Sequence, residues 1–165
     1  MKANAKGAAK VGVTEMTKKT SKYSPTNENI IFWDLPGIGT PTYPNLEEYC
    51  KKVGGLEKYD AFLIFCKRRF TQYDKELAEK VSSEINKPFF FVRTYVDYDL
   101  RNAKEDEGSQ YNEDFVLEEM KKSCMENLGD LTKDKKNIFL IDNKAPEKFD
   151  FQRLKESITE ALPDE

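Results

Sequence analysis

The chain of 165 residues contains no histidine, which excludes any mechanism or metal site that requires an imidazole. Cysteine is scarce: Cys50, Cys66 and Cys124 are far apart and form no Cys-x-x-Cys motif, which predicts reduced structural thiols rather than a zinc site. No apolar run is long enough to cross a membrane, and no hydrophobic stretch follows Lys2 and Lys6. The sequence therefore predicts neither a membrane-spanning nor a secreted protein.

Charge is unevenly distributed along the chain, although the net charge is only −3. Residues 1–22 hold six lysines against one glutamate, a balance of +5 that leaves −8 for the remainder. We predict a basic, flexible arm over residues 1–23 and one domain over residues 24–165. A plain solvated arm is favoured over one that contacts phosphates or an anionic membrane surface.

Short continuous apolar runs alternate with amphipathic segments along most of the chain. Strands that are apolar on both faces are typical of a parallel sheet covered by helices on both sides, so the predicted fold class is three-layer α/β, with a mostly parallel sheet and helices on both faces. The predicted strands are 27–33, 61–66, 88–94 and 137–141, and the predicted helices are 46–53, 72–85, 113–128 and 151–162. A polar, acidic stretch, 99–112, is expected to be a surface loop.

Carboxylates follow three of the predicted strands, at Asp34, Asp97 and Asp142. Parallel strands present their carboxyl ends at one edge, where α/β proteins bind ligands, so the three side chains are expected to share that edge. Asp34 and Gly37 also form an Asp-x-x-Gly pattern, in which the carboxylate associates with Mg²⁺ and the glycine N–H approaches a phosphate. That pattern alone is weak, because a strand ending in a tight turn gives the same residues.

The sequence resembles the G domain of the immunity-related, interferon-inducible GTPases. The resemblance rests chiefly on two blocks, Asp-Leu-Pro-Gly-Ile-Gly over residues 34–39 and Phe-Val-Arg-Thr-x-x-Asp over residues 91–97. It extends over nearly the whole length, through Gly7–Lys10, Tyr59-Asp60, Arg69-Phe70, Ile138–Leu140 and Asp150-Phe151. The resemblance implies a GTP-binding, GTP-hydrolysing protein of innate immunity, located in the cytoplasm and peripherally on intracellular membranes, that forms homodimers through the nucleotide face and binds no nucleic acid.

The resemblance also implies roles for individual residues. Asp34 and Thr17 would contact the Mg²⁺ ion that accompanies GTP, and Gly37 would contact the γ-phosphate. Thr94 opens the guanine-recognition motif, whose Asp97 would accept hydrogen bonds from guanine. Asp142 and Asn143 stand where the family has Ser-Asn, so the Asn143 backbone N–H is the candidate donor to guanine O6, while Asp142 adds a like charge near Asp97.

Several positions depart from the family pattern. Tyr95 stands where the motif usually has lysine, and Val11 stands where switch I commonly has threonine, leaving Thr14 and Thr17 as the nearest hydroxyls. The Gly-x-x-x-x-Gly-Lys-[Ser/Thr] phosphate-binding loop occurs nowhere in the chain, and the N-terminal strand and first helix around it are expected to be missing. At about 1.5–3 kcal/mol for each charge-assisted bond, the loss of that loop would remove about 6 kcal/mol or more of binding energy.

Three hypotheses therefore remain open. The first is a truncated GTPase of this family, an incomplete G domain over residues 24–165 with a switch I remnant in the basic arm and weak or no activity. The alternative is a nucleotide-independent pseudo-GTPase interaction module, which the basic arm, Tyr95 and Asp142 favour and the intact Asp34, Gly37 and Asp97 oppose. An unrelated doubly wound domain is the third, and the two specific blocks argue against it.

Overall fold

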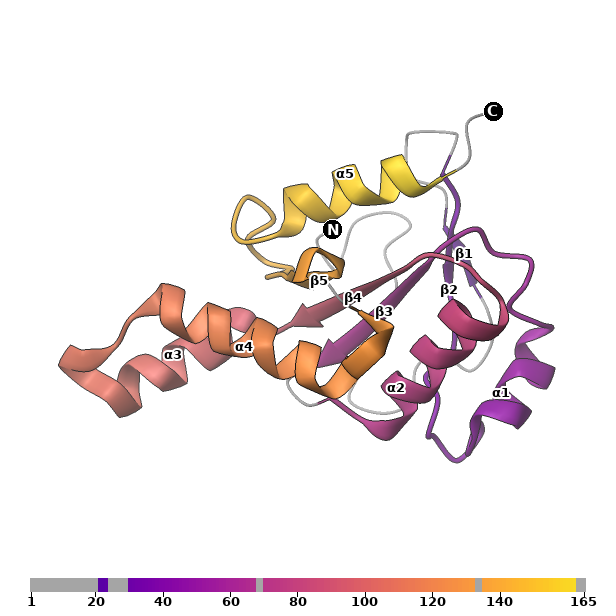
Figure 1. Cartoon of the computed structure of the whole chain (residues 1–165), viewed down its shortest axis with the longest axis horizontal. Helices are drawn as coiled ribbons and strands as arrows, with labels where there is room; N and C mark the ends of the chain where they lie inside the picture. The colour runs from indigo at the N-terminus through magenta and orange to yellow at the C-terminus, as the bar shows by residue number, and fades with distance from the viewer. Residues whose placement is uncertain (1–20, 24–29, 68–69, 133–134, 163–165) are drawn as a thin grey trace. The chain divides into compact units, whose positions relative to one another are not determined.

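The computed structural model describes residues 21–23, 30–67, 70–132 and 135–162 (Figure 1). It divides into two compact units, Met1–Leu56 and Glu57–Glu165. The predicted boundary between the basic arm and the domain, at residues 23 and 24, adjoins a segment outside the described ranges, and it stays a prediction.

A parallel sheet forms the centre of the second unit. Its strands are β3 (Phe62–Lys67), β4 (Phe89–Thr94) and β5 (Ile138–Leu140), in the order β3-β4-β5. The register pairs Ile64 with Phe91 and Val92 with Phe139. Because β4 is the central strand, Phe91 and Val92 are fully buried, as its continuous apolar sequence predicts.

Helices cover both faces of this sheet, which confirms the predicted α/β class. Helix α5 (Phe151–Ala161) packs on one face, where Leu154 joins a cluster with Phe90, Val92, Phe139 and Ile141. Helices α2 (Gln72–Glu79) and α4 (Glu113–Leu128) contact β3 and β5 from the side opposite α5 (Figure 1). Among the described residues, no helix combines the length and apolarity needed to cross a bilayer.

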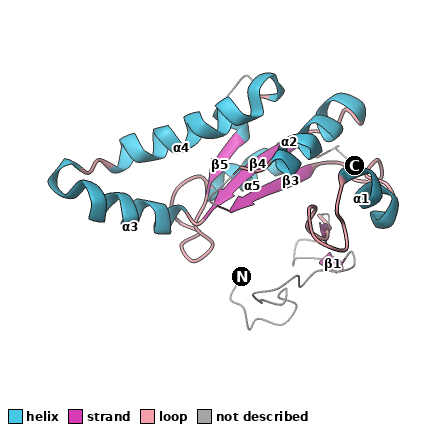
Figure 2. Ribbon diagram, turned by 90° about the horizontal axis from the view of Figure 1, so that it is seen from below, coloured by secondary structure: helices cyan, strands magenta, loops and turns pink. Residues whose placement is uncertain are grey.

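The prediction of a loop over residues 99–112 is wrong. Helix α3 occupies Val96–Glu107 and is followed by a 3₁₀ turn, Gly108–Gln110. It buries only Val96 and Leu100, so its apolar stripe is too short to stand out in a polar sequence. Helices α3 and α4 lie side by side and extend together beyond the sheet (Figure 2), which leaves most of α3 in solvent.

The predicted helix over residues 72–85 begins where expected, but its hydrogen-bonding pattern changes from α-helical to π-helical near its end. Residues Gln72–Glu79 are α-helical, and Lys80–Glu84 form a π-helical turn. Thr71 caps the amino terminus, as predicted: its hydroxyl accepts the Asp74 backbone N–H, and the Asp74 carboxylate accepts the Thr71 backbone N–H at 2.8 Å. These two reciprocal hydrogen bonds form a capping box.

We expect Thr71→Ala to lower the free energy of unfolding by about 1 kcal/mol, because it removes the acceptor for an amide at the helix terminus. Urea denaturation followed by circular dichroism measures the change. Thr71→Ser is the control, since it keeps the hydroxyl and should lie close to the native value. Equal losses in the two variants would contradict the capping role.

The first unit holds β1 (Ser21–Tyr23), β2 (Phe32–Asp34) and α1 (Leu46–Val53). Strands β1 and β2 pair antiparallel, with Lys22 opposite Trp33. The described strands therefore form a mostly parallel set divided between two sheets, with the antiparallel pair separate from β3-β4-β5. The prediction of a buried strand up to Trp33 is wrong. Phe32 and Trp33 are 37% and 45% exposed, and a two-stranded ribbon offers little surface to bury them.

Candidate nucleotide-binding site

The carboxyl end of β4 carries the predicted guanine-recognition motif. Thr94 is buried, and its hydroxyl donates to the Cys66 carbonyl of β3 at 3.5 Å. Asp97 lies in the first turn of α3, where the positive end of the helix dipole favours a carboxylate. Its side chain is about one-third exposed and pairs with Arg101 at 3.5 Å. The motif is therefore built across a strand end and the first turn of the next helix.

The segment after β5 lies at the same edge of the sheet. The register pairs Arg93 with Leu140, and the Ile141 N–H donates to the Arg93 carbonyl at 3.0 Å. Asp142 therefore follows β5 beside the end of β4. Its carboxylate accepts the Lys144 backbone N–H at 2.8 Å, and Asn143 between them is exposed. Asp97 and Asp142 each have a local partner, and the predicted repulsion between the two carboxylates stays a prediction.

The structure shows two side-chain pairs at this edge that the sequence analysis does not predict. Arg93 and Asp99, both mostly buried, form an ion pair at 2.9 Å that ties β4 to α3. Lys67, the last residue of β3, places its ammonium nitrogen 4.5 Å from the centroid of the Tyr95 ring. The sequence does place Lys67 at this edge, because Lys67 directly follows the predicted strand over residues 61–66. Asp99 lies in a segment whose sequence predicts a loop, so its pairing with Arg93 cannot be predicted from the sequence.

Asp34 and Gly37 belong to the first unit. Asp34 ends β2, and the loop after it is closed by hydrogen bonds. Thr40 donates its hydroxyl to the Gly37 carbonyl at 3.3 Å, and Gly39, at φ 78°, donates its N–H to the Tyr43 carbonyl at 2.8 Å. At this φ Gly39 has the left-handed backbone conformation that favours glycine. At Gly37 an added Cβ would meet Thr40 at an ordinary 3.7 Å, so packing within the loop does not demand glycine there.

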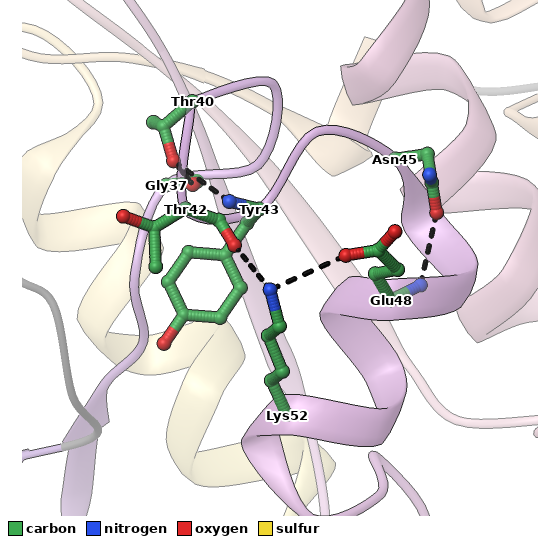
Figure 3. A network of polar contacts seen from close by, with 7 residues as sticks. All are labelled: Gly37, Thr40, Thr42, Tyr43, Asn45, Glu48 and Lys52. Carbon is green, nitrogen blue, oxygen red and sulfur yellow. Dashed lines mark hydrogen bonds and ion pairs between the residues drawn. The ribbon is translucent and has the colours of Figure 1, made fainter.

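A lysine from α1 tethers this loop (Figure 3). Lys52 donates to the Thr42 carbonyl at 2.7 Å and pairs with Glu48 at 3.2 Å. Asn45 caps the helix by accepting the Glu48 backbone N–H at 2.9 Å. These contacts fix the segment between the Asp34 turn and α1. The prediction that Asp34 shares an edge with Asp97 and Asp142 stays a prediction, because Asp34 belongs to the other unit.

The described residues offer few side chains that could coordinate a metal ion. No cluster of three or more acidic, cysteine or histidine side chains occurs within the described ranges. Asp34 is one carboxylate, and Thr17 lies outside those ranges. This donor set fits Mg²⁺ held mainly by nucleotide phosphates and water, with one or two protein ligands, and does not fit an all-protein cage.

The two buried cysteines have raised thiol pKa values. None of the three cysteines, all within the described ranges, forms a disulfide. Burial raises the pKa of the Cys66 thiol to about 12, and burial also raises the pKa of Cys124. Both groups stay protonated at neutral pH and pack as small apolar side chains.

Comparison with solved structures identifies a similar fold. A structure of Era, determined with MgGDPNP and a fragment of 16S ribosomal RNA, aligns with 93% of this chain and 47% of its own, at a TM-score of 0.54 and 22% identity. At that identity the likeness concerns the fold alone. It agrees with the α/β architecture of a P-loop GTPase.

Sequence comparison is more specific. A profile described as "Interferon-inducible GTPase (IIGP)" matches residues 2–165. The chain is 38% identical to mouse interferon-gamma-inducible GTPase 10, over 94% of this chain and 37% of that protein. It is 35% identical to mouse interferon-inducible GTPase 1, over 95% of this chain and 38% of that protein. The chain thus spans less than two-fifths of the length of these relatives. On this evidence, the chain belongs to the interferon-inducible GTPase family.

Proposed function

We propose that this chain binds guanine nucleotides at the carboxyl edge of β4 and β5, more weakly than a GTPase with a phosphate-binding loop. The supporting observation is the register of β4 and β5, which brings Thr94–Asp97 and Asp142-Asn143 to one edge. Asp97 would accept hydrogen bonds from guanine N1 and its amino group, and the Asn143 N–H would donate to O6. No other nucleobase presents those two donors beside that acceptor.

Hydrolysis of GTP is the activity that family membership suggests for this site. Family membership also suggests that Asp34 would help to hold Mg²⁺ and that Gly37 would contribute its backbone N–H to the terminal phosphate. The bound ion would neutralise charge on the phosphates. Because the chain lacks the Gly-x-x-x-x-Gly-Lys-[Ser/Thr] sequence, we propose weak or no hydrolysis by this chain.

Titration with a fluorescent GDP analogue and Mg²⁺ tests the binding proposal. We expect a Kd in the micromolar range or weaker, and we expect Asp97→Asn to raise it by about a hundredfold. Two hydrogen bonds to a charged group contribute about 3 kcal/mol, and tenfold in Kd corresponds to 1.4 kcal/mol. The same variant should bind xanthosine diphosphate better than the native chain does, because an asparagine N–H can donate to the xanthine carbonyl.

Asp106→Asn is the matched control, because Asp106 is an exposed acid on the same helix and the change in charge is identical. It should leave both affinities unchanged. A native chain that binds no GDP at millimolar concentration would reject the proposal and support the nucleotide-independent interaction module. A loss of GDP binding in Asp97→Asn without any gain for the xanthosine nucleotide would also count against direct recognition.

We further propose, from family membership, a cytoplasmic protein that reaches intracellular membranes peripherally and forms homodimers through the nucleotide face. Sedimentation with and without GDP tests the dimer, and flotation with vesicles containing anionic lipids tests membrane binding. A monomer at every nucleotide concentration would overturn the first proposal. Recovery of all the protein in the unbound fraction would overturn the second.

A further inference from the structure

A relay of hydrogen bonds links helix α1 to Gly37 across the loop after β2 (Figure 3). Lys52 of α1 donates to the Thr42 carbonyl at 2.7 Å. The N–H of the same peptide group, which belongs to Tyr43, donates to the Thr40 hydroxyl at 3.3 Å. That hydroxyl in turn donates to the Gly37 carbonyl at 3.3 Å. One peptide group and one hydroxyl therefore connect the Lys52 ammonium group to Gly37.

The three hydrogen bonds of this relay all run in the same direction, from Lys52 towards Gly37. An ammonium group that donates to a carbonyl polarises the peptide group, so the N–H of that group becomes a better donor. The hydroxyl that accepts from this N–H becomes a better donor for the same reason. The bond that fixes the Gly37 carbonyl is therefore strengthened by a charge on α1.

The Lys52 ammonium group is itself held in place by three groups. Besides the Thr42 carbonyl, it contacts the Glu48 carboxylate at 3.2 Å and lies 5.6 Å from the centroid of the Tyr43 ring. Tyr43 is 5% exposed and packs edge-on against Tyr49, with ring centroids 5.6 Å apart. These contacts restrict a side chain that is otherwise flexible, so its charge has a defined position at the start of the relay.

The other end of the relay lies at the surface. Gly37 is exposed, and a Cβ added there would meet the Thr40 side chain at an ordinary 3.7 Å. Packing within the loop therefore does not explain a glycine at this position. A second use of glycine is to let a ligand approach the backbone closely, and an exposed peptide group of fixed orientation suits that use.

We propose that Lys52 is a positioning residue, which acts through the Thr42–Tyr43 peptide group and the Thr40 hydroxyl to hold Gly37 ready for the terminal phosphate of a nucleoside triphosphate. The inference rests on the proposed function, because it explains how one contact of that site is kept in place. Without the Lys52 charge, the loop would reach other orientations and the phosphate would lose a donor that is already oriented. A nucleoside diphosphate has no such phosphate, so its affinity would not depend on Lys52.

The experiment compares the Kd values of GDP and of the GTP analogue GDPNP, each with Mg²⁺. Lys52→Met keeps an apolar stem without the charge. It should raise the Kd of GDPNP about tenfold, as the loss of one hydrogen bond to a charged group predicts, and change the Kd of GDP less than twofold. Lys51→Met is the matched control, because Lys51 pairs with Glu47 on the same helix and the change in charge is identical. It should leave both Kd values within twofold of the native ones.

Variants at Thr40 interrupt the relay at its middle. Thr40→Val removes the hydroxyl at nearly constant volume, and it should raise the Kd of GDPNP to the same extent as Lys52→Met. Thr40→Ser retains a hydroxyl and should restore most of the affinity that Thr40→Val loses. The double variant Lys52→Met/Thr40→Val should bind GDPNP no more weakly than either single variant, because both changes interrupt the same relay.

Hydrogen exchange of the Gly39 amide measures the order of the loop without any nucleotide. This amide donates to the Tyr43 carbonyl at 2.8 Å, so its exchange requires the loop to open. It should exchange several-fold faster in Lys52→Met and in Thr40→Val than in the native chain, and at the native rate in Lys51→Met.

Several results would overturn the inference, and they differ from failure of the proposed function. If the native chain binds GDP but Lys52→Met leaves the ratio of the two Kd values unchanged, the positioning role is wrong and the proposed function stands. Equal weakening of GDPNP binding in Lys51→Met would reveal a general effect of charge, and unchanged Gly39 exchange in Lys52→Met would refute the relay. If the native chain binds neither nucleotide at millimolar concentration, the proposed function fails and the positioning role fails with it.

Discussion

Asp150→Ala is expected to lower the free energy of unfolding by about 3 kcal/mol. The Asp150 carboxylate accepts the Leu140 backbone N–H of β5 at 2.9 Å and pairs with Lys121 of α4 and Arg153 of α5, each at 3.3 Å. Its side chain is only 16% exposed, so these groups would lose a partner in a mostly dry environment. Breaking a mostly buried charged network by removing one member leaves the others unsatisfied.

Urea denaturation at pH 7 measures this loss, and Glu147→Ala supplies the control. Glu147 is an exposed acid in the same loop before α5, so its removal should change stability by less than about 0.5 kcal/mol. Similar losses in the two variants would show that Asp150 does not join β5 to the two helices.

The effect of Asp150 should also depend on pH. Burial alone would raise its pKa, but the Leu140 N–H, Arg153 and Lys121 together hold the pKa below its usual value. A depressed carboxyl pKa contributes stability that is fully present above the unfolded pKa of about 3.9 and is lost as pH falls through the folded pKa. The difference in stability between the native chain and Asp150→Asn should therefore shrink below about pH 4. A difference that stays constant down to pH 2 would contradict this account.

The elements that could be predicted from sequence are those with an unbroken apolar or amphipathic pattern. The cores of β3, β4 and β5 are continuous apolar runs, and α1, α4 and α5 have clear apolar spacing. Helix α3 was missed because it buries only Val96 and Leu100. The burial of β2 was predicted wrongly, since an apolar strand indicates burial only when other layers cover it.

At the candidate site, the rule that parallel strands share a carboxyl edge predicts one edge for Asp34, Asp97 and Asp142. The register of β4 and β5 brings the segments that carry Asp97 and Asp142 to one edge, whereas the place of Asp34 stays a prediction because it belongs to the other unit. The same rule could have included Lys67, which ends β3. What it could not supply is the left-handed backbone of Tyr95 or the contact between Lys67 and its ring, because these depend on register and dihedral angles. The roles of all these residues remain predictions.

Asp99→Ala is expected to lower the free energy of unfolding by about 3–5 kcal/mol. Arg93 and Asp99 form an ion pair at 2.9 Å with side chains only 14% and 16% exposed. Removing Asp99 would leave the Arg93 guanidinium largely buried without its partner, and its Nε atom already lacks a hydrogen-bond acceptor among the described residues. The start of α3 should loosen as well, so the proposed binding of GDP through Asp97 should weaken in this variant.

The double variant Arg93→Met/Asp99→Leu should be less destabilised than Asp99→Ala, because it removes both charges and fills the space with apolar atoms. The pair Asp97–Arg101 on the same helix offers a control: Arg101 is 64% exposed, so Arg101→Ala should cost less than about 1 kcal/mol. Urea denaturation of the three variants measures their free energies of unfolding and distinguishes an unpaired guanidinium from altered packing as the cause of the loss. If the double variant loses as much as Asp99→Ala, the cost comes from altered packing at the start of α3, whereas recovery in the double variant identifies the unpaired guanidinium as its cause.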